Sequence, residues 1–324
     1  GHQIVNCKRW SCKMAILLHS VQPNLRLVYH FLVLSALMAS QCSSLSSIPR
    51  IFLITGATDG IGRHTAERLA EDGHHLLVHG RKPDAGKLLS SSLSSRGAAS
   101  VRYFNADLSD LSEVERLSCE ILAFSERIDV LINNAGVFDP DVSHSAQGYE
   151  TTWHVNVMAP FLLTRKLLPL LTTSAEDHSF VPRIITTSSI SQSSSLWPDR
   201  FPKLFQRKGP VQSAHGAYSD SKLGDYLFTV RLSQILKESG CERLQRIKCL
   251  TMDPGTVNTK MLLAGWGACG ITVKSANNTY KLAATELGSN ADSGSYHFGG
   301  RGSKDSHDPE KLQILWEKLE ECTG

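Results

Sequence analysis

After Pro49 the chain alternates short apolar runs with longer segments of helical pattern, and this alternation limits the fold more than any other feature. The first run, IFLIT at residues 51–55, is continuously apolar, as expected for a strand buried on both faces of a parallel sheet. Strands are predicted at residues 51–55, 76–79, 101–104, 130–133, 183–187 and 247–252, and helices at residues 61–72, 111–124, 149–171 and 217–239. Repeated strand–helix units with right-handed crossovers predict a doubly wound α/β fold, a parallel sheet with helices on both faces.

We interpret residues 49–324 as a single Rossmann-type domain. No internal repeat of fixed period is present in this part of the sequence. The serine-rich stretches at residues 90–95 and 191–195 are typical of loops and not of linkers between domains.

Residues 1–48 form an N-terminal extension of different composition. They contain basic residues but no acidic residue, and they include the apolar run LVYHFLVLSALM at residues 27–38. This pattern resembles a signal-peptide core or a short membrane anchor, although the run is short for a bilayer span. The extension is therefore either a targeting segment, with membrane association through residues 15–38, or an artefact of the gene model that ends where Met38 starts the native protein.

Charge outside the extension is balanced. The whole chain has 34 Lys and Arg and 31 Asp and Glu, and setting aside Lys8, Arg9, Lys13 and Arg26 leaves 30 basic against 31 acidic residues. A net charge of −1 offers no excess of positive charge for a phosphate backbone, so nucleic-acid binding is disfavoured.

The eight cysteines are scattered and form no CxxC pair, and no His or Cys cluster has zinc-like spacing, so no metal site is expected. Cys119 and Cys249 fall in predicted elements, which fits buried reduced thiols. This usage favours an intracellular, cytoplasmic location. The alternative is the endoplasmic-reticulum membrane or an organelle, if the extension is a targeting segment.

A glycine-rich turn, TGATDGIG at residues 55–62, leaves the first predicted strand and enters the first predicted helix. Its glycines permit a tight turn and let the backbone approach a pyrophosphate, which then lies at the positive end of the helix. Such turns also occur merely because a chain must reverse, but here the strand, the turn and the helix are all in place. The turn predicts a dinucleotide site.

The end of the second predicted strand indicates which nicotinamide cofactor is bound. A fold of this kind that uses NAD normally places Asp or Glu there, to hold the ribose 2′-hydroxyl. This chain has Gly80 followed by Arg81. An acid repels a 2′-phosphate, whereas a guanidinium binds one through paired hydrogen bonds. We therefore expect NADP(H) to be favoured over NAD(H), the alternative being that Arg81 is only a solvated loop residue.

Tyr218 and Lys222 form a YxxxK pair on a predicted helix, where a spacing of four places both side chains on one side. The pKa of a free tyrosine is about 10, too high for a base at neutral pH. An adjacent ammonium stabilises the phenolate, so we expect Lys222 to lower the pKa of Tyr218. Taken alone, such a pair more often lies on a helix surface without a function. Its catalytic interpretation therefore depends on the other motifs.

Together, TGxxxGxG and YxxxK resemble the short type of the short-chain dehydrogenase/reductase family, and the resemblance covers essentially all of residues 49–324. It implies that Ser189, which follows the fifth predicted strand, binds the reacting oxygen, with Ser188 as the alternative. It also implies that Asn156 is the fourth catalytic residue, supporting a water that relays protons from Lys222. The loop between Ser189 and Tyr218 is longer than is usual in the family.

The resemblance implies further cofactor contacts. Asp107 takes the place of the family's adenine-binding Asp, and residues 133–136 match its NNAG element. The PGxVxT element places the Val257 backbone and the Thr259 hydroxyl at the nicotinamide amide. One departure concerns Asp59, which lies where some NADP-using relatives carry a second basic residue. The predicted cofactor-binding residues are Gly56, Thr58, Asp59, Gly60, Ile61, Gly62, Arg81, Asp107, Leu108, Asn134, Ala135, Gly136, Tyr218, Lys222, Pro254, Gly255, Val257 and Thr259.

Several stretches, including WHVNVMAPFLLT at residues 153–164, resemble the retinol-dehydrogenase-like subgroup, although Asp253 replaces its more usual His before Pro-Gly. We expect an oxidoreductase that interconverts an alcohol and a carbonyl on a lipophilic small molecule of the retinoid, steroid or lipid-carbonyl kind. The predicted substrate pocket uses residues 191–215 and 260–271, with apolar side chains that could instead cap the core. These are Trp197, Phe201, Phe205, Met261, Leu262, Leu263 and Trp266.

Two other functions share these motifs. A non-catalytic NADP(H)-binding sensor or scaffold is the main alternative, but such relatives commonly lose the Tyr, Lys or Ser that this chain keeps. An epimerase or dehydratase is disfavoured by the glycine spacing. The family resemblance also implies a homo-oligomer formed through the helices at residues 149–171 and 217–239.

Overall fold

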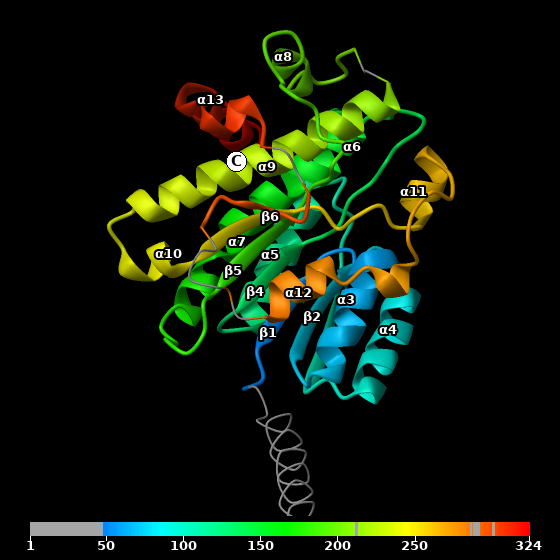
Figure 1. Cartoon of the computed structure of the whole chain (residues 1–324), viewed down its shortest axis with the longest axis vertical. Coiled ribbons are helices and arrows are strands. Elements are labelled where there is room, and N and C mark those ends of the chain that lie inside the picture. The colour runs from blue at the N-terminus through cyan, green and yellow to red at the C-terminus, as the bar shows by residue number, and fades with distance from the viewer. Residues whose placement is uncertain (1–47, 211–212, 286, 288–291, 300–301) are drawn as a thin grey trace, which may run out of the picture. The chain divides into compact units, whose positions relative to one another are not determined.

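One sheet of seven strands is the centre of the computed structural model (Figure 1), which describes residues 48–210, 213–285, 287, 292–299 and 302–324. The strands are β1 Ile51–Ile54, β2 His75–Gly80, β3 Ser100–Asn105, β4 Val130–Asn133, β5 Arg183–Thr187, β6 Lys248–Met252 and β7 Tyr296–His297. Their order is β3-β2-β1-β4-β5-β6-β7, and every pairing is parallel. The predicted doubly wound α/β fold is confirmed.

β1 lies between β2 and β4, where the winding of the chain reverses. Phe52 of β1 pairs with Leu76 on one side and with Val130 on the other, and all three side chains are buried. Strands covered on both faces bury most of their side chains, which explains apolar runs such as IFLI in β1. In an open sheet such a reversal opens a crevice at the carboxyl ends of the strands, and it is the usual position of a ligand site.

Helices cover both faces of the sheet (Figure 1). They are α3 Gly60–Glu71, α4 Pro83–Arg96, α5 Leu111–Phe124, α6 Thr151–Trp153, α7 Ala159–Ser174, α8 Phe201–Leu204, α9 Ala214–Glu238, α10 Glu242–Arg246, α11 Lys260–Gly265, α12 Asn278–Ala284 and α13 Pro309–Thr323. A π-helix at His154–Met158 joins α6 to α7, and 3-10 turns occur at Val273–Ser275 and Lys304–His307.

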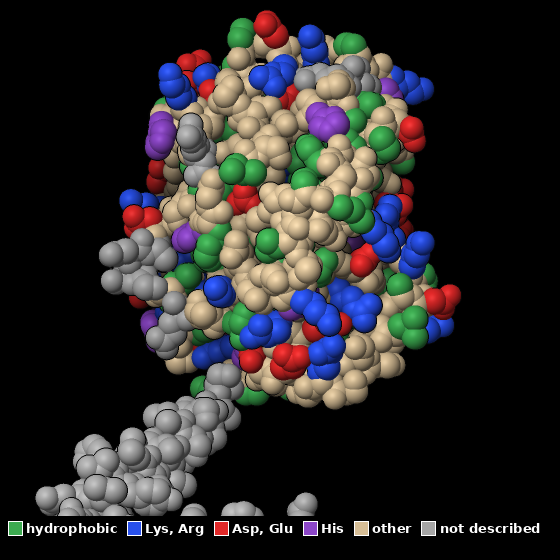
Figure 2. Space-filling view, turned by 45° about the vertical axis from the view of Figure 1, so that its right-hand side comes forward, with side chains coloured by type: hydrophobic (Ala, Val, Ile, Leu, Met, Phe, Trp, Pro, Cys, Tyr) green, Lys and Arg blue, Asp and Glu red, His purple; other side chains and the backbone are tan. Residues whose placement is uncertain are grey.

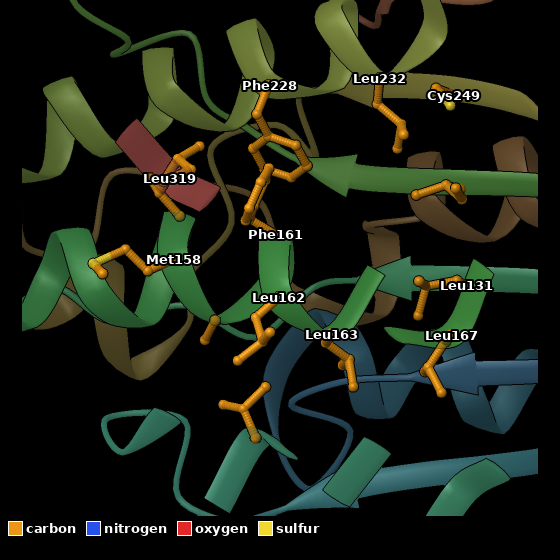
Figure 3. Packing of buried hydrophobic residues seen from close by; sticks show 14 of the residues in the cluster. Leu131, Met158, Phe161, Leu162, Leu163, Leu167, Phe228, Leu232, Cys249 and Leu319 are labelled. Atoms are coloured by element: carbon orange, nitrogen blue, oxygen red, sulfur yellow. The ribbon is translucent and has the colours of Figure 1, made fainter. Parts of the chain in front are cut away.

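Two apolar clusters hold these layers together, one on each face of the sheet. In the larger cluster, Phe161 of α7 and Phe228 of α9 point toward one another (Figure 3), with their ring centroids 6.1 Å apart. Trp316 of α13 packs on the other side of Phe161 at 4.8 Å. Burial of each such side chain contributes about 1.5–3 kcal/mol. This packing fixes α9, the helix that carries Tyr218 and Lys222.

The structure corrects the sequence analysis at several elements. All six predicted strands are present, but β7, only two residues long, was not predicted. Residues 90–95, predicted as a loop, lie in α4, because the buried Leu89 and Leu93 anchor that helix against the sheet. The predicted helix at residues 149–171 is interrupted by the π-helix, which carries Asn156. Cys249 is buried as expected, whereas Cys119 is exposed on α5.

The N-terminal extension and its apolar run lie outside the described residues. Residues Pro49–Gly324 form one compact unit. Within the described part of the chain, no helix has the length and apolar character needed to cross a membrane.

Candidate active site

A cavity of about 580 Å³ opens at the carboxyl ends of the strands around β1 and β4. Its volume lies in the range of roughly 300–1,000 Å³ that is typical of ligand pockets. Every residue predicted to bind the cofactor lines this cavity, and so do Ser189, Tyr218 and Lys222. Asn156 is the one predicted catalytic residue that does not line it. The strand order therefore brings motifs from distant parts of the sequence to a single site.

The turn after β1 needs glycine at positions where the backbone has a positive φ angle or packs closely against its neighbours. Gly56 and Gly60 have positive φ angles of 65° and 56°. A Cβ at Gly62 would lie 2.4 Å from Nδ2 of Asn134 and 2.5 Å from the carbonyl oxygen of Gly56. Asp59 caps α3 by accepting a hydrogen bond from the backbone N–H of Gly60. A cradle of this shape at a helix N-terminus fits the pyrophosphate of a nicotinamide dinucleotide.

Two side chains hold this turn in place. The Nδ2 of Asn134, after β4, donates to the carbonyl oxygens of Thr55 and Gly56 at 2.9 and 3.3 Å. His79 of β2 accepts a hydrogen bond from the Gly56 N–H at Nδ1 (3.4 Å), while its Nε2 lies 3.1 Å from the carbonyl oxygen of Ala106. Burial lowers the pKa of His79 to about 4, so the ring is neutral and can fill both roles. Sequence analysis missed His79, since a lone His at a strand end carries no recognisable signal.

Arg81 and Asp107 lie where the sequence analysis placed them, beyond the ends of β2 and β3, and both line the cavity. The Arg81 side chain is exposed. Gly80 leaves space for Thr58, because a Cβ at position 80 would lie 2.5 Å from Cγ2 of Thr58. Asp107 accepts hydrogen bonds from the backbone N–H and the hydroxyl of Ser109.

Asp59 forms an ion pair that sequence analysis did not anticipate. Nζ of Lys260, the first residue of α11, lies 2.6 Å from its Oδ2. The hydrogen bond from Lys260 is the main reason that the pKa of Asp59 is lowered. Both residues line the cavity, so the acid that counted against NADP(H) has a positive partner beside it.

Tyr218 of α9 and Ser189, which follows β5, come together at the centre of the cavity. The Ser189 hydroxyl is close enough to the Tyr218 phenol to lower its pKa, and it also lies 2.8 Å from the hydroxyl of Ser191. The Ser188 hydroxyl instead donates to the carbonyl oxygen of Lys222 at 2.7 Å, and Ser188 is buried. The geometry therefore supports Ser189, and not its neighbour, as the serine that meets a substrate oxygen.

Lys222 lies one helical turn after Tyr218, with Nζ 5.7 Å from the centre of the tyrosine ring. Nζ donates to the carbonyl oxygen of Thr187 at 2.9 Å and to Oδ2 of Asp225 at 2.7 Å. Burial lowers the pKa of Lys222, but Asp225 and Tyr218 outweigh that effect and the pKa is raised. Lys222 is therefore a cation at neutral pH.

The expected lowering of the Tyr218 pKa is not found. Burial raises the pKa of Tyr218 above its ordinary value, and Lys222 and the Ser189 hydrogen bond offset this only in part. Asp225, which no sequence motif marked, acts in the same direction as burial. The YxxxK spacing reveals the ammonium near Tyr218, but it reveals neither the desolvation of the phenol nor the nearby carboxyl group.

Asn156 lies behind the cavity wall. Its Oδ1 accepts from the N–H of Val137 at 2.8 Å, and its Nδ2 donates to the Val137 carbonyl and to the Ser221 hydroxyl. The side chain thus ties the π-helix to the segment after β4 and to α9. π-helical turns within α-helices are frequent at functional sites. Participation of Asn156 in a proton relay stays a prediction.

The segment after β6 closes another side of the cavity. Asp253 accepts a hydrogen bond from the Gly255 N–H at 2.6 Å, and this fixes the Pro-Gly turn in which Asp253 replaces the family's more usual His. Thr259 caps α11 by accepting from the Leu262 N–H. A Cβ at Gly60 would lie 3.2 Å from Cγ2 of Thr259, so the two cofactor-binding segments meet there.

The apolar lining matches the prediction in part. Met261, Leu262 and Trp266 line the cavity, and the Trp266 ring lies 5.3 Å from that of Tyr218. Phe138, which sequence analysis missed, packs 4.9 Å from Trp266. Other residues predicted for the pocket lie elsewhere. Trp197, Phe201 and Phe205 pack with the core, which was the alternative considered, and Leu263 is exposed without lining the cavity.

A family model, several proteins of known sequence and a solved structure are similar to this chain. A family model described as short chain dehydrogenase matches residues 50–196. Human retinol dehydrogenase 11 is 33% identical over 228 residues, 70% of this chain and 67% of that protein. Human polyprenol dehydrogenase is 29% identical over 294 residues, 85% of each chain. The structure of the Pseudomonas aeruginosa RhlG/NADP active-site complex matches with a TM-score of 0.53 and 26% identity, covering 68% of this chain and 77% of that one.

Proposed function

Because this chain belongs to the short-chain dehydrogenase/reductase family, and is thus an oxidoreductase acting on a CH–OH group with NAD(P), we propose that it prefers NADP(H) and acts on a lipophilic alcohol or carbonyl. A retinoid, a steroid or a lipid carbonyl is the substrate class that we favour. The observation that carries the proposal is the pairing of a cationic end and an apolar aromatic end within one cavity.

The cationic end supports the cofactor preference. Arg81 lines the cavity, and no acidic residue occupies the end of β2. Lys260 pairs with Asp59 and so offsets the charge of the acid in the turn, and Arg81 contributes a guanidinium at the same end of the cavity. A 2′-phosphate is stabilised by such a group, whereas a free 2′-hydroxyl gains little from it. The similar RhlG structure contains NADP.

The apolar end supports the substrate class. Trp266, Met261 and Leu262 line the cavity beside Tyr218. Trp266 and Ile190, which also line it, are 38% and 67% exposed and so offer apolar surface to an incoming molecule. On the face shown in Figure 2, hydrophobic side chains reach the surface among mixed acidic and basic ones. The names of two relatives, a retinol and a polyprenol dehydrogenase, point to the same class.

The residues of the site divide the chemistry between them. The bound nicotinamide supplies hydride to a carbonyl carbon or takes it from an alcohol. Ser189 holds the substrate oxygen by a hydrogen bond, and Tyr218 donates a proton to that oxygen in reduction or accepts one in oxidation. Lys222, held by Thr187 and Asp225, places its positive charge beside the phenol.

A non-catalytic sensor is disfavoured by the same geometry, because Tyr218, Ser189 and Lys222 all line one cavity and Lys222 Nζ lies 5.7 Å from the centre of the Tyr218 ring. Homo-oligomerisation and association with a membrane stay predictions. Trp316 of α13 packs against Phe161 of α7, one of the helices assigned to the oligomer contact.

A substrate panel tests the proposal. Retinal, a steroid ketone, a long-chain aldehyde and a short polar aldehyde would each be assayed with NADPH and with NADH, following the nicotinamide absorbance. We expect turnover with NADPH to exceed that with NADH at equal concentration, and lipophilic carbonyls to have the higher kcat/KM. Preference for NADH, or for the short polar aldehyde, would contradict the corresponding half of the proposal.

A further inference from the structure

Asp225 is a buried acid that contacts Lys222 and has not yet been connected with the protonation of Tyr218. It lies three residues after Lys222 on α9, and the two side chains are only 2% and 5% exposed. Lys222 Nζ is 2.7 Å from Oδ2 of Asp225. The other carboxyl oxygen, Oδ1, is buried and has no hydrogen-bond partner among the described residues. The Asp225 carboxyl group is therefore directed at Lys222.

The surroundings of Tyr218 leave few other charges to act on it. Lys222 and Asp225 come from its own helix, Asp253 follows β6, and Tyr296 lies on β7. The nearby side chains of β5 and the π-helix are uncharged. They are Thr186, Thr187 and Asn156. His215 lies farther out on α9, against Phe138 and Trp266. Among the residues that the structure describes, Asp225 is the one acid that contacts the ammonium of Lys222.

We propose that Asp225 is a positioning residue that anchors the Lys222 ammonium and offsets its charge, so that Tyr218 keeps its proton to higher pH. The inference rests on the proposed function and deepens it, since it sets the pH range in which the site can donate a proton. A lysine without a counter-charge would favour the phenolate more strongly. A lysine paired with a buried carboxylate favours it less.

The directions in which the individual groups shift the pKa values agree with this role of Asp225. Lys222 lowers the pKa of Tyr218, whereas burial, Asp225 and Asp253 raise it. Burial raises the pKa of the Asp225 carboxyl to about 7, against the opposing effect of Lys222. Above that range Asp225 carries its negative charge, which opposes the loss of the Tyr218 proton.

The proton balance of carbonyl reduction shows why the protonation state of Tyr218 matters. The O–H bond of Tyr218 breaks and a new O–H bond forms on the substrate oxygen, whose carbon receives hydride from the reduced nicotinamide. The products are the alcohol, the oxidised nicotinamide and the Tyr218 phenolate, which regains its proton from solvent. A Tyr218 that stays protonated to higher pH therefore extends reduction to higher pH.

Asp225→Asn tests the role, because it removes the charge and keeps the shape. The first measurement is the phenolate absorbance of the cofactor-free protein as a function of pH, with Tyr218→Phe subtracted to isolate Tyr218. We expect Tyr218 of the wild type to titrate above about 10, and that of Asp225→Asn about one pH unit lower than the wild type. The second measurement is the pH profile of turnover, in which the loss of reduction and the onset of oxidation move down by the same amount.

Two further variants separate charge from folding. Asp305→Asn removes another buried acid whose Oδ1 lies 2.7 Å from a lysine, Lys311, and should leave the Tyr218 titration unchanged. Asp225→Glu keeps the charge and should restore most of the wild-type profile. If Asp225→Asn does not fold, a wild-type Tyr218 that titrates below about 10 overturns the proposal.

The two proposals fail in different ways. Titration curves of wild type and Asp225→Asn that superimpose overturn the role of Asp225, whatever the activity. Absence of turnover with every alcohol and carbonyl overturns the proposed function, while the titration of the cofactor-free protein still decides the role of Asp225.

Discussion

Replacement of Arg81 by alanine should weaken NADPH binding and leave NADH binding nearly unchanged. Arg81 lines the cavity just after β2, and its exposed side chain is available to a 2′-phosphate. A hydrogen bond between charged groups contributes about 1.5–3 kcal/mol. Because the side chain is exposed, we expect the lower part of that range, which corresponds to a loss of affinity of roughly tenfold.

The assay is the dissociation constant of each cofactor, measured by titration at low and at high ionic strength. The NADPH effect should shrink as salt is added, because salt screens an exposed charge pair. Lys87→Ala is a matched control, since it removes one positive charge from an exposed site on α4 that does not line the cavity. An unchanged NADPH to NADH ratio in Arg81→Ala, or a wild type that prefers NADH, would refute the assignment of NADP(H).

Two other substitutions probe the two ends of the cavity. Gly62→Ala should abolish most of the rise in Tm that NADPH produces, because the new Cβ would lie 2.4 Å from Nδ2 of Asn134. An undiminished rise in Tm would mean that the turn does not hold the cofactor. Trp266→Ala should lower kcat/KM for a lipophilic carbonyl by about tenfold and leave a short aldehyde unaffected. Leu263→Ala, in the helix α11 that directly precedes Trp266, is its control, and equal losses for both substrates would contradict the pocket assignment.

Most of the fold could be predicted from the sequence because each strand buried on both faces is a continuous apolar run. β7 could not, since two residues, Tyr296 and His297, carry no periodicity. The helix α4 was missed because its serines favour loops in isolation. In the structure Ser90 donates to the carbonyl of Gly86, and the burial of Leu89 and Leu93 outweighs the low helix propensity.

Some residues of the candidate site could likewise be predicted from the sequence, and others could not. Motif residues such as Gly62, Arg81 and Tyr218 could be placed because their spacing along the chain reflects their place in the fold. His79 and Asp225 could not, since each acts on a motif residue through a contact that spacing alone does not reveal. The direction of the Tyr218 pKa also depended on burial, which is a property of the folded chain.

The central claim is that this chain is an NADP(H)-dependent oxidoreductase whose proton donor is Tyr218, and Tyr218→Phe tests it most directly. The measurement is NADPH consumption with an accepted lipophilic carbonyl, together with the NADPH dissociation constant of the same preparation. We predict that the wild type consumes one NADPH for each alcohol formed, and that Tyr218→Phe loses about a hundredfold or more of kcat with cofactor affinity nearly intact. A variant that keeps a tenth of the wild-type rate would contradict the account.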